Sequence, residues 1–189
     1  MSDAGYRRLS ERVVYENPWL RFEAHEMIHP NGTPGVHGVV VTPRASAVVL
    51  LDGEDVLLAR QSRFALDAIV LEVIKGGRHA GEDGLACAQR EAREEAGVVA
   101  VRWRSLGRAY EIPSIVQEPV ELYLGVGLSP AALPPEEVER IEVVRIRFDD
   151  ALAACIDGRI DDAVTALALL RARSVLQEAS RRFRCAGFC

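Results

Sequence analysis

The chain has 189 residues, of which 49% are hydrophobic, and its formal net charge is −5 at pH 7. This length predicts one domain, or one domain with a small appendage, and the hydrophobic content is enough for a full core. The negative net charge argues against nucleic acid as a partner, and no apolar run approaches the length that spans a membrane. The charged N-terminus is unlike a signal peptide, and the four cysteines lack zinc-type or disulfide-framework spacing. We therefore expect a cytoplasmic protein with reduced thiols.

Residues 11–42 are expected to form two or three short strands, separated by Asn17-Pro18 and by the turn-rich segment 29–35. These strands have too few apolar positions for a core of their own. Strands with an apolar face and no partner sheet tend to be covered by another chain. We therefore predict an N-terminal antiparallel β extension, residues 1–42, that pairs two copies into a homodimer, followed by a main domain, residues 43–189.

The main domain is expected to consist mostly of strands. In chain order its elements are strands at 46–51, 56–61 and 69–74, a helix between Gly81 and Gly97, strands at 99–112, 120–128 and 141–148, and helices at 149–158 and 160–182. One central helix and two terminal helices among strands predict an α+β domain with α/β/α layers and a mixed sheet.

The stretch from Gly76 to Val98 carries the clearest chemical signal. Its glycines and charged residues stand at fixed spacing: Gly76, Glu82, Arg90, Glu91, Glu94, Glu95 and Gly97. At 3.6 residues per turn, Glu91, Glu94 and Glu95 fall within an arc of about 100° on one helix face. Such like charges repel unless a cation neutralises them, and oxygen ligands without Cys or His suit Mg²⁺ or Mn²⁺. Arg90, one turn before Glu94, can orient that carboxylate. Taken alone, the acidic segment also fits a solvated helix with surface ion pairs.

This spacing resembles the box that defines the Nudix hydrolases, which cleave nucleoside diphosphates linked to another group. The resemblance implies the Nudix α/β/α sandwich and assigns Glu91 and Glu95 as the main metal ligands. It makes Glu94 a second-rank ligand or an orienting group, and the backbone carbonyl of Lys75 a further ligand. Arg90 and Glu94 are accordingly expected to take part in catalysis.

Residues 56–64 and 71–77 resemble the corresponding run in the ADP-ribose pyrophosphatases. By that resemblance Arg63 contacts the diphosphate, with Arg60 as second choice, and Glu72 belongs to the substrate site. An arginine that only caps a strand end is the alternative for this short signal.

Two further features bear on the substrate. Pro113 stands fifteen residues beyond Val98, at the position of a proline that marks the ADP-ribose group. Lys75 stands where that group often has alanine, which leaves other ADP-linked substrates open. The segment 128–143 resembles a mobile acidic loop that supplies a glutamate for metal binding or water activation, with Glu136, Glu137 and Glu139 as candidates.

The resemblance implies metal-dependent hydrolysis of ADP-ribose to AMP and ribose 5-phosphate. The alternatives are another diphosphate substrate, such as GDP-mannose, NADH or a dinucleoside polyphosphate, and a nucleotide-sensing module without turnover. In ADP-ribose pyrophosphatases the N-terminal portion pairs across a two-fold axis and contributes adenine contacts. Trp19 and Phe22 are therefore candidates for stacking on the base, and core packing within the N-terminal sheet is the alternative.

Overall fold

The computed structural model describes residues 5–131 and 141–186, with side chains described as far as Ala179. The chain forms two compact units. The first contains the chain up to Arg44 together with Tyr110–Pro119, and the second contains Ala45–Ala109 and the chain from Val120 onward. No described helix has both the length and the apolar character needed to cross a membrane.

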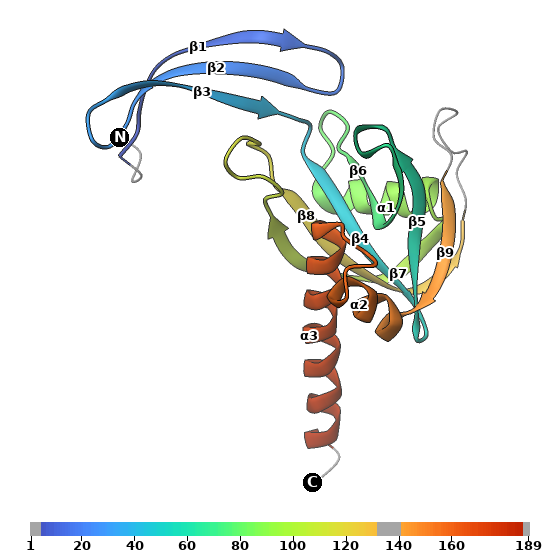
Figure 1. Cartoon of the computed structure of the whole chain (residues 1–189). Coiled ribbons are helices and arrows are strands. Elements are labelled where there is room, and N and C mark those ends of the chain that lie inside the picture. Colours follow the sequence, from blue (N-terminus) through green and yellow to red (C-terminus); the bar gives the residue numbers. More distant parts are fainter. Residues whose placement is uncertain (1–4, 132–140, 187–189) are drawn as a thin grey trace. The chain divides into compact units, whose positions relative to one another are not determined.

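The first unit is a three-stranded antiparallel sheet of β1 (Arg7–Glu16), β2 (Arg21–Ile28) and β3 (Pro34–Val41), with β2 in the centre (Figure 1). Segment Tyr110–Pro119 lies along β3, where Val40 exchanges backbone hydrogen bonds with Ile115 and Gln117. The strands expected within residues 11–42 are present, although the first begins earlier, at Arg7.

The second unit is built on a six-stranded sheet with the order β7-β8-β4-β6-β5-β9. The strands are β4 (Ala45–Asp52), β5 (Asp55–Arg63), β6 (Ala68–Gly77), β7 (Val98–Ala109), β8 (Val120–Pro130) and β9 (Glu142–Arg147). β4 and β8 run parallel and the other neighbouring pairs are antiparallel, so the sheet is mixed, as predicted.

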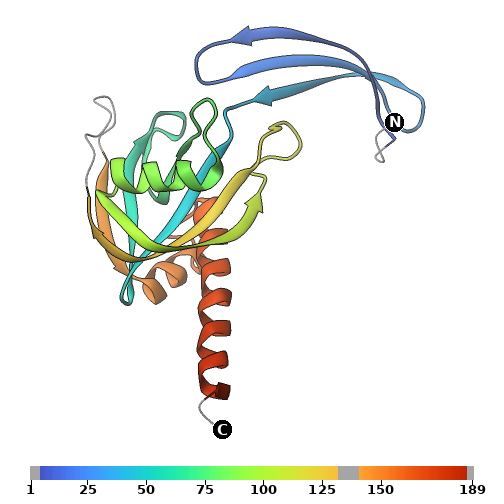
Figure 2. The ribbon, with the colours of Figure 1, turned by 180° about the vertical axis from the view of Figure 1, so that it is seen from behind.

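Helices cover both faces of this sheet, as the two opposite views show (Figures 1 and 2). Helix α1 (Gly84–Glu94) packs on one face, against a cluster that includes Val48 and Ile74. Helices α2 (Phe148–Ile156) and α3 (Ala163–Ala186) pack on the other face, against a cluster that includes Val49 and Val73. Neighbouring strand residues point to opposite faces, so β4 and β6 supply both clusters. The α/β/α sandwich predicted from the sequence is confirmed.

Strand β6 changes its partner within its own length. It pairs with β5 as far as Val73, which lies opposite Leu58. From Ile74 it pairs with β4, where Ile74 lies opposite Val48. The residues that lead into the predicted site therefore follow a break in the hydrogen-bond ladder.

Candidate active site

Helix α1 carries the predicted carboxylates, and its local sequence fixes where it begins and how it lies. Asp83 caps it, because its side chain accepts a hydrogen bond of 2.8 Å from the backbone N–H of Ala86. Ala88 and Ala92 are fully buried against the sheet, and their small side chains let the helix lie close to it. The helix therefore holds Glu91 in a buried position at the edge of the core.

The guanidinium of Arg90 lies among three glutamates of this region. Nη1 donates to Glu91 at 2.7 Å and to Glu94 at 2.6 Å, while Nε and Nη2 each donate to Glu82 at 3.1 Å. Burial lowers the pKa of Arg90, but the hydrogen bonds and charges of these carboxylates raise it more, so the guanidinium stays charged. The hydrogen bond from Arg90 likewise holds the pKa of Glu82 below its usual range. The expected contact between Arg90 and Glu94 is present, and Arg90 also orients Glu91.

Strand β6 brings its backbone against the same carboxylates. A Cβ atom on Gly76 would overlap the carboxylate of Glu91, so only glycine leaves room for that group beside the strand. The backbone N–H of Lys75 donates to Glu95 at 3.3 Å. In an extended strand the N–H and C=O of one residue point to the same side, so the Lys75 carbonyl is directed to the side where Glu95 lies.

These groups fit a hard divalent cation. The donors are the carboxylates of Glu91, Glu94 and Glu95 and the carbonyl of Lys75, and such all-oxygen sets suit Mg²⁺ and Mn²⁺. The contact at Gly76 holds one of these carboxylates directly against the strand. The ligand roles of these four residues stay predictions, and the geometry is compatible with them.

Arg63 and Glu72 form an ion pair beside this region. Arg63 Nη2 donates to Glu72 Oε2 at 2.6 Å, and its Nε lies 3.2 Å from both carboxylate oxygens. Glu72 is 4% exposed and also accepts a hydrogen bond of 3.3 Å from Gln61. Its carboxylate lies 3.5 Å from Lys75 Nζ. By strand alternation Arg63 shares the α1 face of the sheet with buried Ala59.

Arg60, the second candidate for the diphosphate contact, lies on the opposite face of β5. It shares that face with Leu58, which packs toward α2 and α3. Its Nη1 donates to the exposed carboxylate of Glu142 on β9 at 3.2 Å. The structure therefore brings Arg63, and not Arg60, to the face that carries α1.

The roles of the remaining predicted site residues stay predictions. Pro113 belongs to the first unit. Glu136, Glu137 and Glu139 lie outside the described residues.

Sequence reasoning missed two residues that contact the predicted site, Gln61 and Asp162. Asp162 Oδ1 accepts a hydrogen bond of 3.1 Å from Lys75 Nζ. Its one signal was the Asp-Asp pair that predicts the start of the last helix, which says nothing about a partner 87 residues away.

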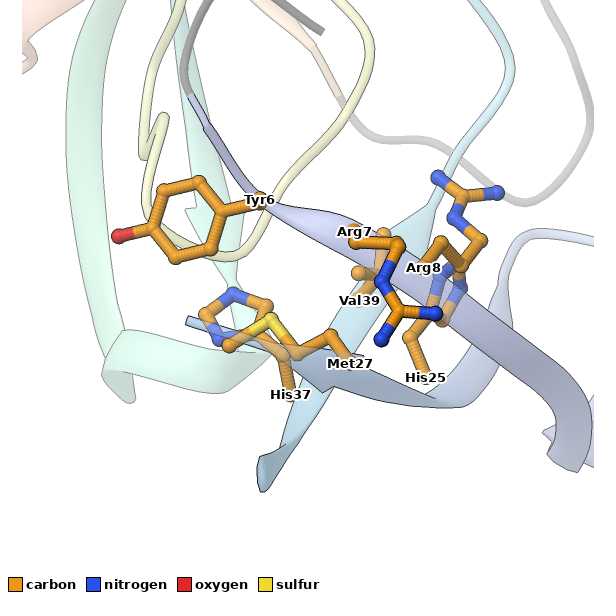
Figure 3. Close-up of a pocket in the computed structure, with 7 residues that line it drawn as sticks. All are labelled: Tyr6, Arg7, Arg8, His25, Met27, His37 and Val39. Atoms are coloured by element: carbon orange, nitrogen blue, oxygen red, sulfur yellow. The ribbon is translucent and has the colours of Figure 1, made fainter. Parts of the chain in front are cut away.

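The first unit contains a pocket of about 560 Å³ lined from all three strands (Figure 3). The lining residues are Tyr6, Arg7, Arg8, His25, Met27, His37 and Val39.

His25 is buried and hydrogen-bonded to Glu23 at 2.7 Å, and Glu23 also accepts from Arg21 at 2.6 Å. These two hydrogen bonds lower the pKa of Glu23. Glu11 lies close enough to complete a group of three metal-type ligands, but its carboxylate is paired with Arg8 at 2.8 Å. Arginines therefore already neutralise both carboxylates of this group.

The two aromatic candidates for base stacking also lie in the first unit. The side chain of Phe22 packs over Gly38, where a Cβ atom would lie 2.9 Å from its ring. Trp19 is 74% exposed. Phe22 thus takes part in packing within the sheet, and Trp19 is available at the surface.

Comparison with known families covers both units. Residues 41–167 match the model described as the NUDIX domain. Residues 6–40 match the model described as the nucleoside diphosphate sugar hydrolase N-terminal domain.

Individual relatives agree with this assignment. The chain is 30% identical over 176 residues to the ADP-ribose pyrophosphatase of Bacillus subtilis (strain 168), covering 90% of this chain and 95% of the relative. It is 27% identical over 166 residues to the methanol dehydrogenase activator of Bacillus methanolicus, covering 86% and 90%. A crystal structure of an ADP compounds hydrolase shares the fold, with a TM-score of 0.84 at 22% identity over 93% of this chain and 96% of that one. The chain therefore belongs to the Nudix hydrolases, and within them it is similar to the ADP-ribose pyrophosphatases.

Proposed function

We propose that this Nudix hydrolase cleaves the diphosphate of ADP-ribose, giving AMP and ribose 5-phosphate, with Mg²⁺ or Mn²⁺ as its cation. The observation that carries the proposal is the pairing of two groups on one face of the sheet. The carboxylate of Glu91 on α1 lies beside Gly76, and Arg63 on the same face is held by Glu72. The first group suits a divalent cation and the second suits a diphosphate. Similarity to the ADP-ribose pyrophosphatase of Bacillus subtilis over 90% of the chain supports ADP-ribose as the substrate.

The carboxylates of Glu91, Glu94 and Glu95 would bind the cation. A divalent cation, when bound, neutralises part of the diphosphate charge and makes a water molecule more acidic. Glu91, Glu95 and the Lys75 carbonyl would hold that cation. Glu94, aligned by Arg90 at 2.6 Å, would orient the site. Phosphoryl transfer needs mainly positioning and charge stabilisation, which fixed carboxylates of this kind supply. One of Glu136, Glu137 and Glu139 would hold or deprotonate the attacking water.

Arg63 would bind the diphosphate of the substrate, and to do so it moves away from Glu72. Its side chain is 35% exposed, whereas that of Glu72 is 5% exposed, so the arginine is the mobile partner. A buried carboxylate that loses its partner is costly. Glu72 keeps Gln61 at 3.3 Å and the Lys75 ammonium at 3.5 Å, and these contacts compensate its charge when Arg63 turns to the substrate.

The first unit would pair two copies of the chain into a homodimer. Every residue of β1 is exposed, including Leu9, Val13 and Tyr15, and β1 is an edge strand with no neighbour beyond it in the described sheet. Long exposed edge strands are usually covered in natural proteins. Closed two-fold dimers are the commonest soluble assembly, and the exposed Trp19 would then be available for adenine.

The test is a panel of diphosphates incubated with the protein and Mg²⁺, scored by phosphate released after alkaline phosphatase is added. The panel contains ADP-ribose, GDP-mannose, NADH and a dinucleoside polyphosphate. We expect ADP-ribose to be cleaved, EDTA to abolish the reaction, and Mg²⁺ or Mn²⁺ to restore it. If GDP-mannose is cleaved and ADP-ribose is not, ADP-ribose is not the substrate, but the protein is still a diphosphate hydrolase. Binding of ADP-ribose without any turnover would instead identify a nucleotide-sensing module.

A further inference from the structure

The backbone that leads into the proposed cation site is not held by the sheet alone. Strand β6 pairs with β5 up to Val73 and with β4 from Ile74 onward. At such a change the regular ladder is interrupted, and the freed backbone groups need other partners. At this change of partner, the backbone N–H of Val73 bonds to a group outside the sheet.

Helix α3 supplies the first of these contacts. The backbone N–H of Val73 donates to the hydroxyl of Thr165 at 2.9 Å. Thr165 is fully buried, and its hydroxyl donates in turn to Asp162 Oδ2 at 2.6 Å. The single hydroxyl thus accepts from the strand and donates to the residue that precedes α3.

Asp162 supplies the second contact while capping the helix. Its Oδ2 also accepts from the backbone N–H of Thr165 at 2.8 Å, and its Oδ1 accepts from Lys75 Nζ at 3.1 Å. Burial raises the pKa of Asp162, but the charge of Lys75 and the hydrogen bonds from Thr165 lower it more, so the carboxylate is ionised. One carboxylate therefore fixes the start of α3 to the side chain of Lys75.

The same short stretch of β6 touches the α1 carboxylates from the other side. The backbone N–H of Lys75 donates to Glu95, and Gly76 lies against Glu91. Since α1 and α3 cover opposite faces of the sheet, β6 contacts the start of α3 on one side and Glu91 and Glu95 on the other.

We propose that Asp162 and Thr165 are positioning residues that set the backbone of Lys75 and Gly76, and thereby the affinity of the α1 carboxylates for Mg²⁺ or Mn²⁺. They act through β6 and not through the substrate. The proposal rests on the proposed function for the identity of the cation. Groups that orient metal ligands from behind typically change metal affinity or activity by about 10- to 100-fold when they are removed.

The test is Mn²⁺ binding to the full-length chain, followed by the loss of the free Mn²⁺ signal in electron paramagnetic resonance. Thr165→Val keeps the shape of the side chain but removes the acceptor for Val73, and we expect Mn²⁺ binding to weaken about 10-fold or more. Thr165→Ser keeps the hydroxyl and is expected to restore binding. Asp162→Asn keeps a good helix cap but weakens the contact with Lys75, so it should shift binding in the same direction as Thr165→Val.

The matched control is Leu169→Ala on the same helix. Leu169 is fully buried in the cluster on the α3 face and its side chain has no hydrogen-bonding group, so its truncation destabilises the fold without removing the hydrogen bonds to β6. We expect Leu169→Ala to lower the unfolding temperature and leave Mn²⁺ affinity unchanged. Wild-type Mn²⁺ affinity in a folded Thr165→Val variant would overturn the proposal. If Thr165→Val does not fold, Asp162→Asn replaces it in the test. Wild-type Mn²⁺ affinity in a folded Asp162→Asn variant would then overturn the proposal.

A second readout follows the backbone itself. Thr165→Val should speed hydrogen exchange of the Val73 amide, and Thr165→Ser should not. If the wild-type chain hydrolyses no diphosphate while Thr165→Val still weakens Mn²⁺ binding, the proposed function fails and the positioning role stands. If ADP-ribose is hydrolysed and Mn²⁺ affinity does not respond to Thr165 or Asp162, the positioning role fails and the function stands.

Discussion

The backbone of Gly76 lies so close to the carboxylate of Glu91 that any side chain at position 76 would overlap it. Gly76→Ala must therefore displace Glu91, and we expect kcat for ADP-ribose hydrolysis to fall about 10²-fold. The double variant of Gly76→Ala with Glu91→Gln should be little worse than Glu91→Gln alone, because both changes remove the same group. Steady-state kinetics of the three variants provides the check, and losses that multiply in the double variant would contradict this account.

Glu91→Gln and Glu95→Gln should each lower kcat by about 10²-fold or more, because each replaces an anionic ligand of the cation by a neutral amide. Glu54→Gln is the control, since the Glu54 side chain is 78% exposed on the turn between β4 and β5. It should keep the wild-type rate. The kinetics are measured at saturating Mg²⁺, with circular dichroism to verify folding. Wild-type rates in both Glu91→Gln and Glu95→Gln would refute the assignment of these residues as metal ligands.

Arg63→Lys is expected to raise KM for ADP-ribose, because an ammonium cannot reproduce the two-pronged contact of a guanidinium with phosphate oxygens. Arg60 offers a matched control three residues away. It lies on the opposite face and pairs with exposed Glu142, so Arg60→Lys should leave KM unchanged. Initial rates across a range of ADP-ribose concentrations separate the two variants. A larger effect at Arg60 than at Arg63 would reverse the assignment.

The thiol of Cys87 should be inert in the folded protein. Cys87 is fully buried, and burial raises its pKa from 9.0 to about 11. The folded state therefore favours the neutral thiol, and this contribution to stability is present below pH 9 and declines as the pH rises toward 11. Iodoacetamide at pH 8 should leave Cys87 unmodified in the native protein and modify it in urea, as read by peptide mass spectrometry. Rapid native labelling of Cys87 would show that the helix opens.

The purified protein should scatter light as a particle of about twice the 20.7 kDa chain mass. Val13→Glu places a charge on exposed β1, and we expect it to yield monomer and to raise KM for ADP-ribose. Ile156→Glu is the control, because Ile156 is 75% exposed at the end of α2 in the second unit. It should stay dimeric. A fully active wild-type monomer would refute both the dimer and the contribution of the N-terminal strands of a second copy to adenine binding.

The sequence predicted helix α1 and its carboxylate face because both depend on local spacing. Asp83 caps the start of the helix, and the helix ends at Glu94, shortly before Gly97, whose φ is 65°. The spacing of glutamates and small alanines sets which side packs on the sheet. The contact of Arg90 with Glu94 followed from the same helical period, and it is present at 2.6 Å. The mixed sheet with helices on both faces followed from the order of the elements.

The choice between Arg63 and Arg60 depended instead on which face of β5 packs against α1. Strand alternation separates the two arginines, but only the packed core tells which face is which. Likewise, Tyr110–Pro119 joins the first unit because Ile115 and Gln117 bond to Val40, far away in the chain.

The sequence by itself thus determined the Nudix motif, its helix and the α+β class, because those are set by residues within a few helical turns of one another. Only the tertiary structure decided how β6 is held. Val73 and Lys75 are anchored by Thr165 and Asp162, which lie about ninety residues further along the chain. Such contacts are fixed when α1 and α3 close on opposite faces of one sheet, and no local spacing encodes that packing.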